Sequence, residues 1–436
     1  MKINSLQRFL LYLTVIAAFT GVLFLSISLG PVHLFPYRFL LMIIWIIFLG
    51  SIFYRNGLLN IVNIKTKNYL IFFGLWMGYA FLSMLWAVDK SAAVRNVTFL
   101  FTGISIIFFL IYYLQSLNHL KWLYWLLIFI FVAQLPVGIW EVTTGNHLEI
   151  AGLFGETIEK LAFMPSAVFR NPNDYAAYIV LTLPLILVWV RYNSNMVGRI
   201  FGILVMILGL WILIMTFSRS SYIALLMGFA FWFLLLLPWK KKFTILALGG
   251  FLCVLLFVAF PTQIFDVMAK FTKQVDSLAP LVLQNENNVP DDARLNLIKN
   301  GLFFTTESMG FGVGAGNGDY YMANHAIYSV GKLTNMHNWW MEIMVNYGIF
   351  IFGGYVIFYL SLLYNLWRIH KRADNMIEKM ICEALLVSLV SFFMASISSS
   401  SILAFPPHWI YLGFILAFLN YSRIKKIQNA YIAYSG

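Results

Sequence analysis

Residues 200–218 read IFGILVMILGLWILIMTFS, a run of nineteen residues without a charged side chain. A helix of about 20 apolar residues is long enough to cross the hydrocarbon core of a bilayer. Similar runs recur along the chain and predict twelve spans, at about 9–29, 36–54, 69–88, 97–115, 121–140, 173–190, 197–216, 221–238, 243–261, 338–363, 380–398 and 404–421. The sequence therefore predicts an all-α polytopic membrane protein with about twelve transmembrane helices.

The composition of the 436-residue chain excludes several classes of protein. Hydrophobic residues make up 61% and charged residues 11%, and the mean hydropathy is +0.82. A soluble domain carries roughly 25% charged residues, so a soluble enzyme, a disordered protein and a nucleic-acid-binding domain are excluded. The strands of a transmembrane β-barrel alternate over about ten residues, whereas these apolar runs are longer and continuous.

The net charge of +12 is distributed unevenly between the two predicted sides of the membrane. With the N-terminus inside, the inner segments hold 18 of the 29 Lys and Arg residues but only three acids, Asp374, Glu378 and Glu383. Lys and Arg accumulate in cytoplasmic loops. We therefore expect both termini to be cytoplasmic and the acid-rich loops to be extracytoplasmic.

Two of the predicted extracytoplasmic loops are long, at 141–172 and 262–337. The second follows the ninth predicted helix and precedes the tenth. A loop of this length is usually functional or carries structure of its own. With no internal repeat, the sequence predicts one membrane domain, 1–436, with an elaborated outer face.

The 262–337 loop contains a predicted short helix and an irregular segment. The helix is expected to begin near Pro290, where Asp residues can cap it, and it places Leu295, Ile298 and Leu302 on one face. Residues 310–318, GFGVGAGNG, must be irregular backbone that allows close approach to a partner. The segment lacks the Lys-Ser/Thr ending of a nucleotide-binding loop.

His337 is the sharpest candidate for chemistry, because it stands where the long loop enters the tenth predicted span, in NMHNWWME from Asn335 to Glu342. A histidine there can act as a general base near neutral pH. The alternative is an interfacial histidine in an aromatic belt with Trp339 and Trp340.

Three arginines are candidates for binding an anion on the same side. Arg219 lies in the short connection FSRSS between two apolar runs, where a charge is costly and is usually functional or paired, although it can also snorkel to lipid headgroups. Arg294 lies on the predicted loop helix, and a surface pair with Asp291 is the simpler explanation from spacing alone. Arg170 precedes the turn Asn-Pro-Asn-Asp that opens the sixth predicted span, where a structural role is as plausible as a functional one. No His or Cys pair has metal-ligand spacing, and the sequence predicts neither a metal nor another cofactor.

Several of these motifs, in this order, resemble the O-antigen ligase and O-antigen polymerase superfamily. They are Asn171-Pro172-Asn173, Ser218-Arg219-Ser220, Arg294 followed by the 310–318 run, and His337-Asn338 followed after nine residues by Gly348. The resemblance covers about residues 165–400. The ligase pattern has a second glycine three residues after the first, but this chain has Ile351 there, with Gly353 and Gly354 following. The choice between ligase and polymerase therefore stays open.

The resemblance implies a GT-C-like bacterial glycosyltransferase that uses a glycan linked to undecaprenyl diphosphate as donor, on the outer face of the cytoplasmic membrane. It implies that Arg219 and Arg294, with Arg170 as a third candidate, bind the diphosphate and that His337 is the base. Metal-independent transfer with inversion would follow. Asn338, Trp339 and Tyr320 are candidates for substrate binding, although interfacial anchoring explains the aromatic residues equally well. The acceptor would be a glycan, a lipid or a wall polymer, and membrane lipid is a further partner.

A different class of function is a twelve-helix transporter or flippase for polysaccharide. Transporters often contain internal repeats and polar residues at mid-membrane. The chain shows no repeat, and its charges gather at the outer rim, which favours surface chemistry. The main exceptions are Gln134 and the serine-rich run 396–401.

Overall fold

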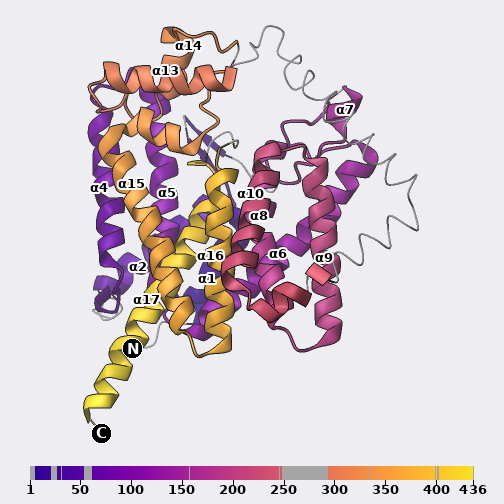
Figure 1. The fold of residues 1–436 in the computed structure, drawn as a ribbon. Coiled ribbons are helices and arrows are strands. Elements are labelled where there is room, and N and C mark those ends of the chain that lie inside the picture. The colour runs from indigo at the N-terminus through magenta and orange to yellow at the C-terminus, as the bar shows by residue number, and fades with distance from the viewer. Residues whose placement is uncertain are drawn as a thin grey trace, which may run out of the picture.

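The computed structural model describes residues 5–20, 27–30, 32–53, 61–156, 158–244, 246–247, 293–331, 333–397, 399 and 402–435. Helices form nearly all of the secondary structure in these residues (Figure 1). The elements of the first half are α1 (Ser5–Ala18), β1 (Ile27–Leu29), β2 (Val32–Leu34), α2 (Pro36–Phe53), α4 (Lys67–Ser83), α5 (Lys90–Tyr113), α6 (Leu117–Thr144), α7 (Glu159–Ala162) and α8 (Pro172–Tyr192). Those of the second half are α9 (Met196–Met215), α10 (Arg219–Phe231), the π-helix η1 (Trp232–Leu236), α13 (Ala293–Glu307), α14 (Gly318–His325), α15 (Trp339–Arg372), α16 (Met376–Ala395) and α17 (Pro406–Ser435).

The hydropathy runs predict helices correctly for most of the chain. Six of the described helices are long and apolar enough to cross a membrane, namely α5, α6, α8, α9, α10 continued by η1, and α15. Helices also occur over the other predicted segments, except for the ninth, 243–261, which lies almost wholly outside the described residues. In its described residues the chain is thus an all-α membrane protein apart from the small β1–β2 hairpin.

The first predicted span, 9–29, is wrong in the parts beyond Ala18 that the structure describes. The helix α1 ends at Ala18, and Ile27–Leu29 instead forms β1, which pairs antiparallel with β2. Backbone pairing of Ile27 with Leu34 across the turn at Gly30, which has φ +59°, replaces helical hydrogen bonds there. Hydropathy alone could not distinguish this short apolar strand from the end of a helix.

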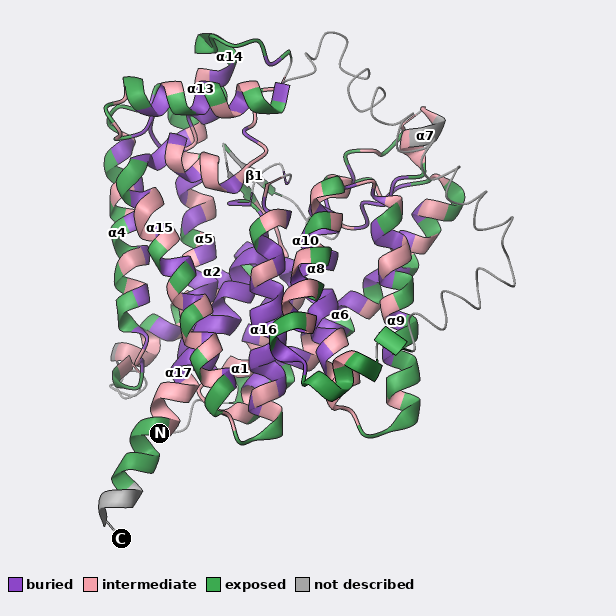
Figure 2. Cartoon of the chain, viewed as in Figure 1, coloured by how far each residue is buried: buried purple, intermediate pink, exposed green. Residues whose placement is uncertain are grey.

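The helices form one bundle with a buried centre (Figures 1 and 2). In this centre α16 packs against α8 and α10, and α17 packs along α5. The first half of α17 is buried, whereas the part after Tyr421 is increasingly exposed and extends away from the bundle. The helices α13 and α14 lie across the opposite end (Figure 1).

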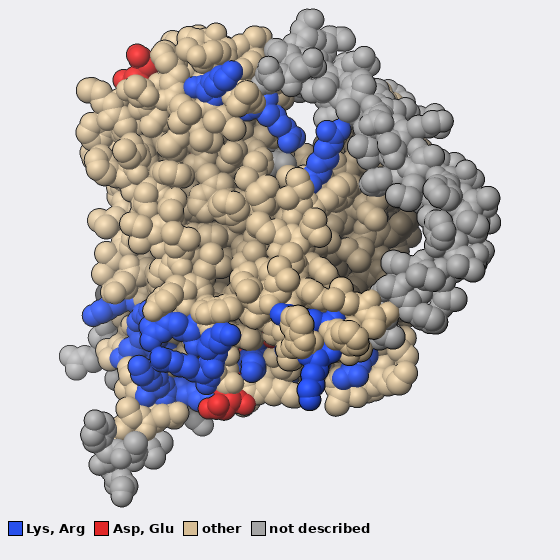
Figure 3. Space-filling view, viewed as in Figure 1, with Lys and Arg blue, Asp and Glu red and all other residues tan. Residues whose placement is uncertain are grey.

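Lys and Arg crowd the end of the bundle at which α1 begins and α17 leaves (Figure 3). Far fewer cations are visible at the other end, near α13 and α10. We call these the basic end and the loop end. The basic end carries the segments that the charge count assigns to the inner side.

A buried carboxylate joins four elements near the basic end. Glu383 of α16 has no exposed side-chain surface and forms an ion pair with Arg191 of α8. It also accepts hydrogen bonds from Trp232 Nε1 of η1 at 2.7 Å and Tyr192 Oη at 3.0 Å, and it contacts His370 Nε2 of α15 at 3.2 Å. Buried charges need such partners, so the network fixes these helices relative to one another.

The loop helix α13 forms at the predicted place, but it buries a different face. Leu295 and Leu302 are 49% and 51% exposed, whereas Leu297 and Phe304 are buried. Gly301 allows this packing, because a side chain there would press against Met341, Val345 and Met336. Packing against α15 decides which face of α13 is buried. The periodicity of the α13 sequence does not encode this contact.

Candidate functional site

The helix α15 is interrupted at Gly348, which divides it into a short helix at the loop end and a long one through the bundle. Gly348 has φ +76° and ψ 179°, whereas the residues on either side are helical. Glycine adopts positive φ without steric cost because it has no Cβ. The residue that the resemblance matched as a motif glycine is therefore the point at which the chain turns into the bundle.

The glycine-rich segment 310–318 packs against this break. Val313 N donates to Val345 O at 2.8 Å, Gly314 N donates to Asn346 O at 3.1 Å, and Ile349 N donates to Gly310 O at 2.9 Å. These hydrogen bonds satisfy backbone groups that the interruption of the helix leaves without intrahelical partners. A Cβ on Gly348 would overlap the carbonyl oxygen of Gly310. The close approach predicted for this segment is thus to another part of the same chain.

The same segment is anchored to the turn between α4 and α5. The Asn317 side chain accepts from Asp89 N at 2.7 Å and donates to Asp89 O at 3.2 Å. Ala315 N donates to Ser83 Oγ at 3.0 Å, and Gly318 N donates to Asn346 Oδ1 at 2.8 Å. The segment therefore holds α14, α15 and the α4–α5 turn together.

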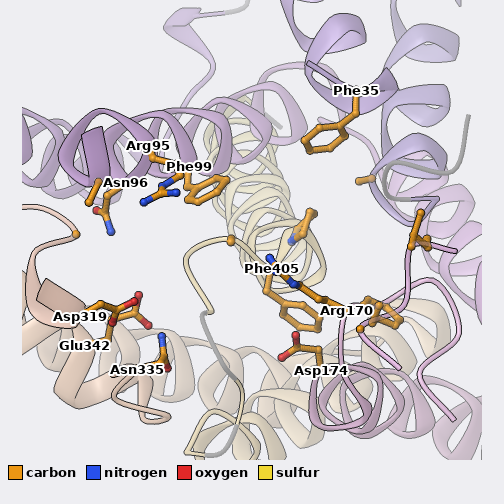
Figure 4. A pocket seen from close by; sticks show the side chains of 18 of the residues that line it. Phe35, Arg95, Asn96, Phe99, Arg170, Asp174, Asp319, Asn335, Glu342 and Phe405 are labelled. Carbon is orange, nitrogen blue, oxygen red and sulfur yellow. The ribbon is translucent and has the colours of Figure 1, made fainter. Parts of the chain in front are cut away.

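A cavity of about 820 Å³ opens beside this junction (Figure 4). Its walls come from α5, the α6–α8 connection, α14, the first turns of α15 and the start of α17. Its polar lining residues are Arg95, Asn96, Arg170, Asp174, Asp319, Asn335, Glu342 and Asn346, and its aromatic ones are Phe35, Phe99, Phe169 and Phe405.

The cavity carries opposite charges on facing walls. Arg95 and Arg170 extend from different walls toward its interior, and the carboxyl groups of Asp319 and Glu342 lie together on a third (Figure 4). In the described part of the chain neither arginine forms an ion pair. Desolvation raises the pKa of Asp319 to about 6, although a hydrogen bond from Asn335 and the charge of Arg95 act in the opposite direction. Asp319 therefore changes charge close to neutral pH.

Asn335 connects this wall to His337. Its side chain hydrogen-bonds Asp319 and, through Oδ1, accepts from the backbone N–H of His337 at 2.8 Å. His337 has φ +46°, in the left-handed region that non-glycine residues seldom occupy. The half-buried His337 is not itself a lining residue of the cavity, but it lies two residues from one. An unusual backbone conformation held by a side-chain hydrogen bond is typical of functional positions.

Arg219 and Arg294 lie close enough at the loop end for their charges to interact, although they are 75 positions apart in the sequence. Arg219 is the first residue of α10, and Arg294 is the second residue of α13. The pKa of Arg294 is lowered by desolvation and by the positive charge of Arg219. Neither forms an ion pair with a described acid. Two guanidinium groups this close can together pair with an anion that carries several oxygens.

Buried hydrogen bonds to Glu141 fix the conformation of the 141–172 loop that carries Arg170. The Glu141 carboxylate accepts from the backbone N–H groups of Ser166 and Ala167 at 2.8 and 2.6 Å and contacts His147 Nδ1 at 3.0 Å. Gly152 N donates to Arg170 O at 2.7 Å. These bonds fix the backbone that directs Arg170 into the cavity.

The three predicted substrate-binding residues have structural contacts. Asn338 caps α15, its Oδ1 accepting from Trp340 N at 3.1 Å and Met341 N at 3.4 Å. Trp339 is 1% exposed and packs among aromatic rings, including that of Trp409. The ring of Tyr320 packs near Tyr321 and His325, and it is not among the cavity-lining residues.

Sequence reasoning missed Arg95, Asp319 and Glu342. Arg95 could have been proposed from the sequence, because it is a charged residue just ahead of the predicted span at 97–115. In the structure it lies within α5. Asp319 follows the glycine-rich segment directly, and Glu342 belongs to the same NMHNWWME stretch as His337. Their convergence depends on how the 310–318 segment packs, which their spacing does not reveal.

Comparison with known proteins gives two matches. A protein family described as O-antigen ligase matches residues 204–359, the part that contains Arg219, Arg294 and His337. The teichuronic acid biosynthesis protein TuaE of Bacillus subtilis (strain 168) is 30% identical over 421 residues, which cover 95% of this chain and 85% of that protein.

Proposed function

The chain belongs to the O-antigen ligase and polymerase superfamily, and from this premise we propose that it transfers a glycan from undecaprenyl diphosphate to an acceptor hydroxyl. Family membership and its apolar helices make it a membrane-embedded glycan ligase or polymerase. The donor, the residues and the mechanism are our proposal. We place the reaction at the loop end, on the extracytoplasmic face of a bacterial cytoplasmic membrane, with both termini cytoplasmic.

The observation that carries the proposal is the pairing of Arg219 with Arg294. Bringing two cations together is unfavourable unless an anion joins them, and a diphosphate offers oxygens to both. Beneath Arg219 lies an apolar cavity of about 530 Å³ between α8, α9, α10 and α16, whose lining includes Tyr222, one turn along α10. A diphosphate at the arginines would place its polyprenyl chain beside this cavity. The two arginines suit the diphosphate of the lipid carrier, and the apolar cavity suits its polyprenyl chain.

The cavity beside the 310–318 segment, which we call the glycan cavity, suits the sugar end of the donor or the acceptor. Its amides, carboxylates and guanidinium groups can donate to and accept from hydroxyls, while its phenylalanine rings offer apolar faces. A volume of about 820 Å³ lies within the usual range for ligand sites. Arg170 lines this cavity, whereas Arg219 and Arg294 do not. We therefore assign Arg170 to the glycan rather than to the diphosphate that the resemblance suggested.

In the proposed reaction the acceptor oxygen attacks the anomeric carbon, and the bond from that carbon to the diphosphate breaks. The electron pair leaves with the diphosphate, whose charge Arg219 and Arg294 stabilise. The imidazole of His337 accepts the proton of the acceptor hydroxyl. Attack opposite the leaving group inverts the anomeric carbon. Because the cations stabilise the leaving group, the reaction needs no metal ion.

The test uses purified protein in lipid, a defined undecaprenyl-diphosphate oligosaccharide, EDTA and no nucleotide sugar. A ladder of lengthened products would identify a polymerase, and products formed only after an acceptor glycan or wall polymer is added would identify a ligase. A flippase is the alternative, and it would move the unchanged donor across a vesicle membrane without lengthening it. Loss of transfer in EDTA that a divalent ion restores would contradict the metal-free mechanism.

Replacing Arg219 by lysine should reduce transfer about tenfold or more, because lysine keeps the charge but loses the fork that pairs two phosphate oxygens. The measurement is kcat/KM for the lipid-linked donor. Arg199→Lys is the matched control, since Arg199 is exposed in the first turn of α9, a full helix length away from Arg219. Full activity of the Arg219 variant would reduce its role to anchoring in lipid headgroups.

Transfer should also depend on the charge of Asp319. Its carboxyl is ionised above its pKa of about 6 and can then accept a hydrogen bond from a substrate hydroxyl, so the rate should rise as pH increases through this value. Asp319→Asn should be slower, and its acid limb should be less steep than that of the parent protein, because only the deprotonation of the base His337 then remains to limit the rate at low pH. The measurement is a pH profile of kcat/KM from about pH 5 to about pH 8. Glu307→Gln, at an exposed acid on α13, should keep the limb, and an unchanged limb in the Asp319 variant would exclude the assignment.

A further inference from the structure

A polar cavity of about 480 Å³ lies at the basic end of the bundle, between the end of α15 and the outer half of α17. We call it the basic pocket. Five of its lining residues are cationic, namely Arg368, Arg372, Arg423, Lys425 and Lys426. Its two acidic residues are Asp374 and Glu378. The pocket therefore carries a clear excess of positive charge.

Only part of this charge is neutralised by described residues. Lys425 Nζ pairs with Glu378 Oε1 at 2.6 Å, and Arg423 Nη1 donates to the backbone carbonyl of Lys65 at 2.7 Å. Arg372 and Lys426 form no ion pair within the described residues. They come from different helices and line one cavity, so an anion in it can contact both.

The position of the pocket along α17 places it at the level of lipid headgroups. The helix is buried up to Asn420, and Ile427, two turns later, is 55% exposed. Around this transition lie the rings of Tyr364 and Tyr421, the first of them beneath the guanidinium of Arg368. Tyrosine and arginine or lysine side chains at one level are typical of a membrane interface. The pocket therefore lies where a helix leaves the hydrocarbon core.

Helix electrostatics explain only some of these cations. Arg372 is in the last turn of α15, where a positive charge complements the helix dipole. Arg423, Lys425 and Lys426 instead lie about ten residues before the end of α17, beyond the reach of that effect. The accumulation of Lys and Arg on the inner side accounts for their presence at the basic end, but not for their convergence with Arg372 on one cavity, which charge complementarity to a phosphate explains.

We propose that the basic pocket binds the phosphate of an anionic phospholipid, such as phosphatidylglycerol or cardiolipin, with its acyl chains along α15 and α17. Basic pockets between transmembrane helices on the cytoplasmic side recognise such headgroups. The proposal is independent of the glycan-transfer function, because it concerns the opposite end of the bundle. The bound lipid would hold α17 against α15 at the point where the two helices separate.

The test measures binding of phosphatidylglycerol and cardiolipin to the full-length protein in detergent by native mass spectrometry, with phosphatidylcholine as the neutral lipid. The Arg372→Gln/Lys426→Gln variant should bind anionic lipid about 30-fold more weakly, since each cation near a lipid surface contributes about five- to sixfold and two are removed. Lys240→Gln/Lys241→Gln removes equal charge from two other exposed lysines and should bind as the parent protein does. A swapped variant, Arg372→Lys/Lys426→Arg, keeps the charge and should retain most of the binding.

Three outcomes would overturn the proposal. Equal weakening in the Lys240/Lys241 variant would indicate a diffuse attraction to the basic end. Undiminished binding in the Arg372/Lys426 variant would exclude the pocket as the site. Displacement of the lipid by inorganic phosphate at equal concentration would assign the pocket to a free anion. Size-exclusion profiles that match the parent protein ensure that a loss of binding is not a loss of fold.

Discussion

Glycan transfer should fall by about 10²–10⁴-fold when His337 is replaced by asparagine, because the acceptor hydroxyl then loses its general base. Asparagine is chosen because residue 337 has φ +46°, and asparagine occupies this region more readily than alanine does. The backbone and the hydrogen bond from residue 337 to Asn335 can then persist while the imidazole is removed. The measurement is kcat for lengthening or ligating a defined undecaprenyl-diphosphate oligosaccharide.

The control for this variant is His325→Ala. His325 is exposed and belongs to the same loop region, but it has no role in the proposed reaction. Its variant should keep transfer close to that of the parent protein. Near-normal product from His337→Asn would end the general-base role, and a comparison with His337→Ala would then show whether only the backbone conformation matters.

Replacing Gly348 by alanine should abolish transfer through loss of structure rather than loss of chemistry. The added Cβ would overlap the carbonyl oxygen of Gly310, and φ +76° is strained for any other L residue. The 310–318 segment could then no longer hydrogen-bond to the break in α15, and the wall of the glycan cavity would shift. We expect lower yield and a thermal unfolding midpoint reduced by several degrees, since strain of this kind costs about 1–3 kcal/mol before the overlap is counted.

Gly353→Ala is the matched control for this substitution. Gly353 lies five residues later in α15, and nothing outside the adjoining backbone of its own helix lies within 4 Å of where its Cβ would be. Alanine favours a helix over glycine by up to about 1 kcal/mol, so this variant should be at least as stable as the parent protein. A Gly348 variant with parental stability and activity would show that the packing of 310–318 is not needed.

Much of the fold could be predicted from the sequence because its driving force is local. Runs such as 200–218 form helices wherever backbone groups must be satisfied in an apolar medium. The prediction failed where a tertiary partner decides the outcome. Ile27–Leu29 is a strand because Val32–Leu34 pairs with it, and α13 buries Leu297 rather than Leu295 because α15 covers that side.

The residues of the candidate site could likewise be predicted from the sequence only in part. Arg219 and Arg294 could be proposed from a resemblance, and the structure brings them together. Arg95 and Asp319 could not be proposed, because their shared cavity exists only after the 310–318 segment has packed against the α4–α5 turn and the break in α15. No spacing rule connects positions more than 200 residues apart. Trp339 had a strong interfacial signal, yet its burial gives it a packing role in the described structure.

The glycan cavity has a consequence for how the protein is made. Its walls are drawn from residues between Ala18 and Pro406, so nine-tenths of the chain must be synthesised before the cavity can close. A ribosome-bound chain or a product truncated before Ala404 lacks one wall. Under the proposed function, an unfinished chain would therefore not consume lipid-linked sugar, because it cannot yet form the complete cavity.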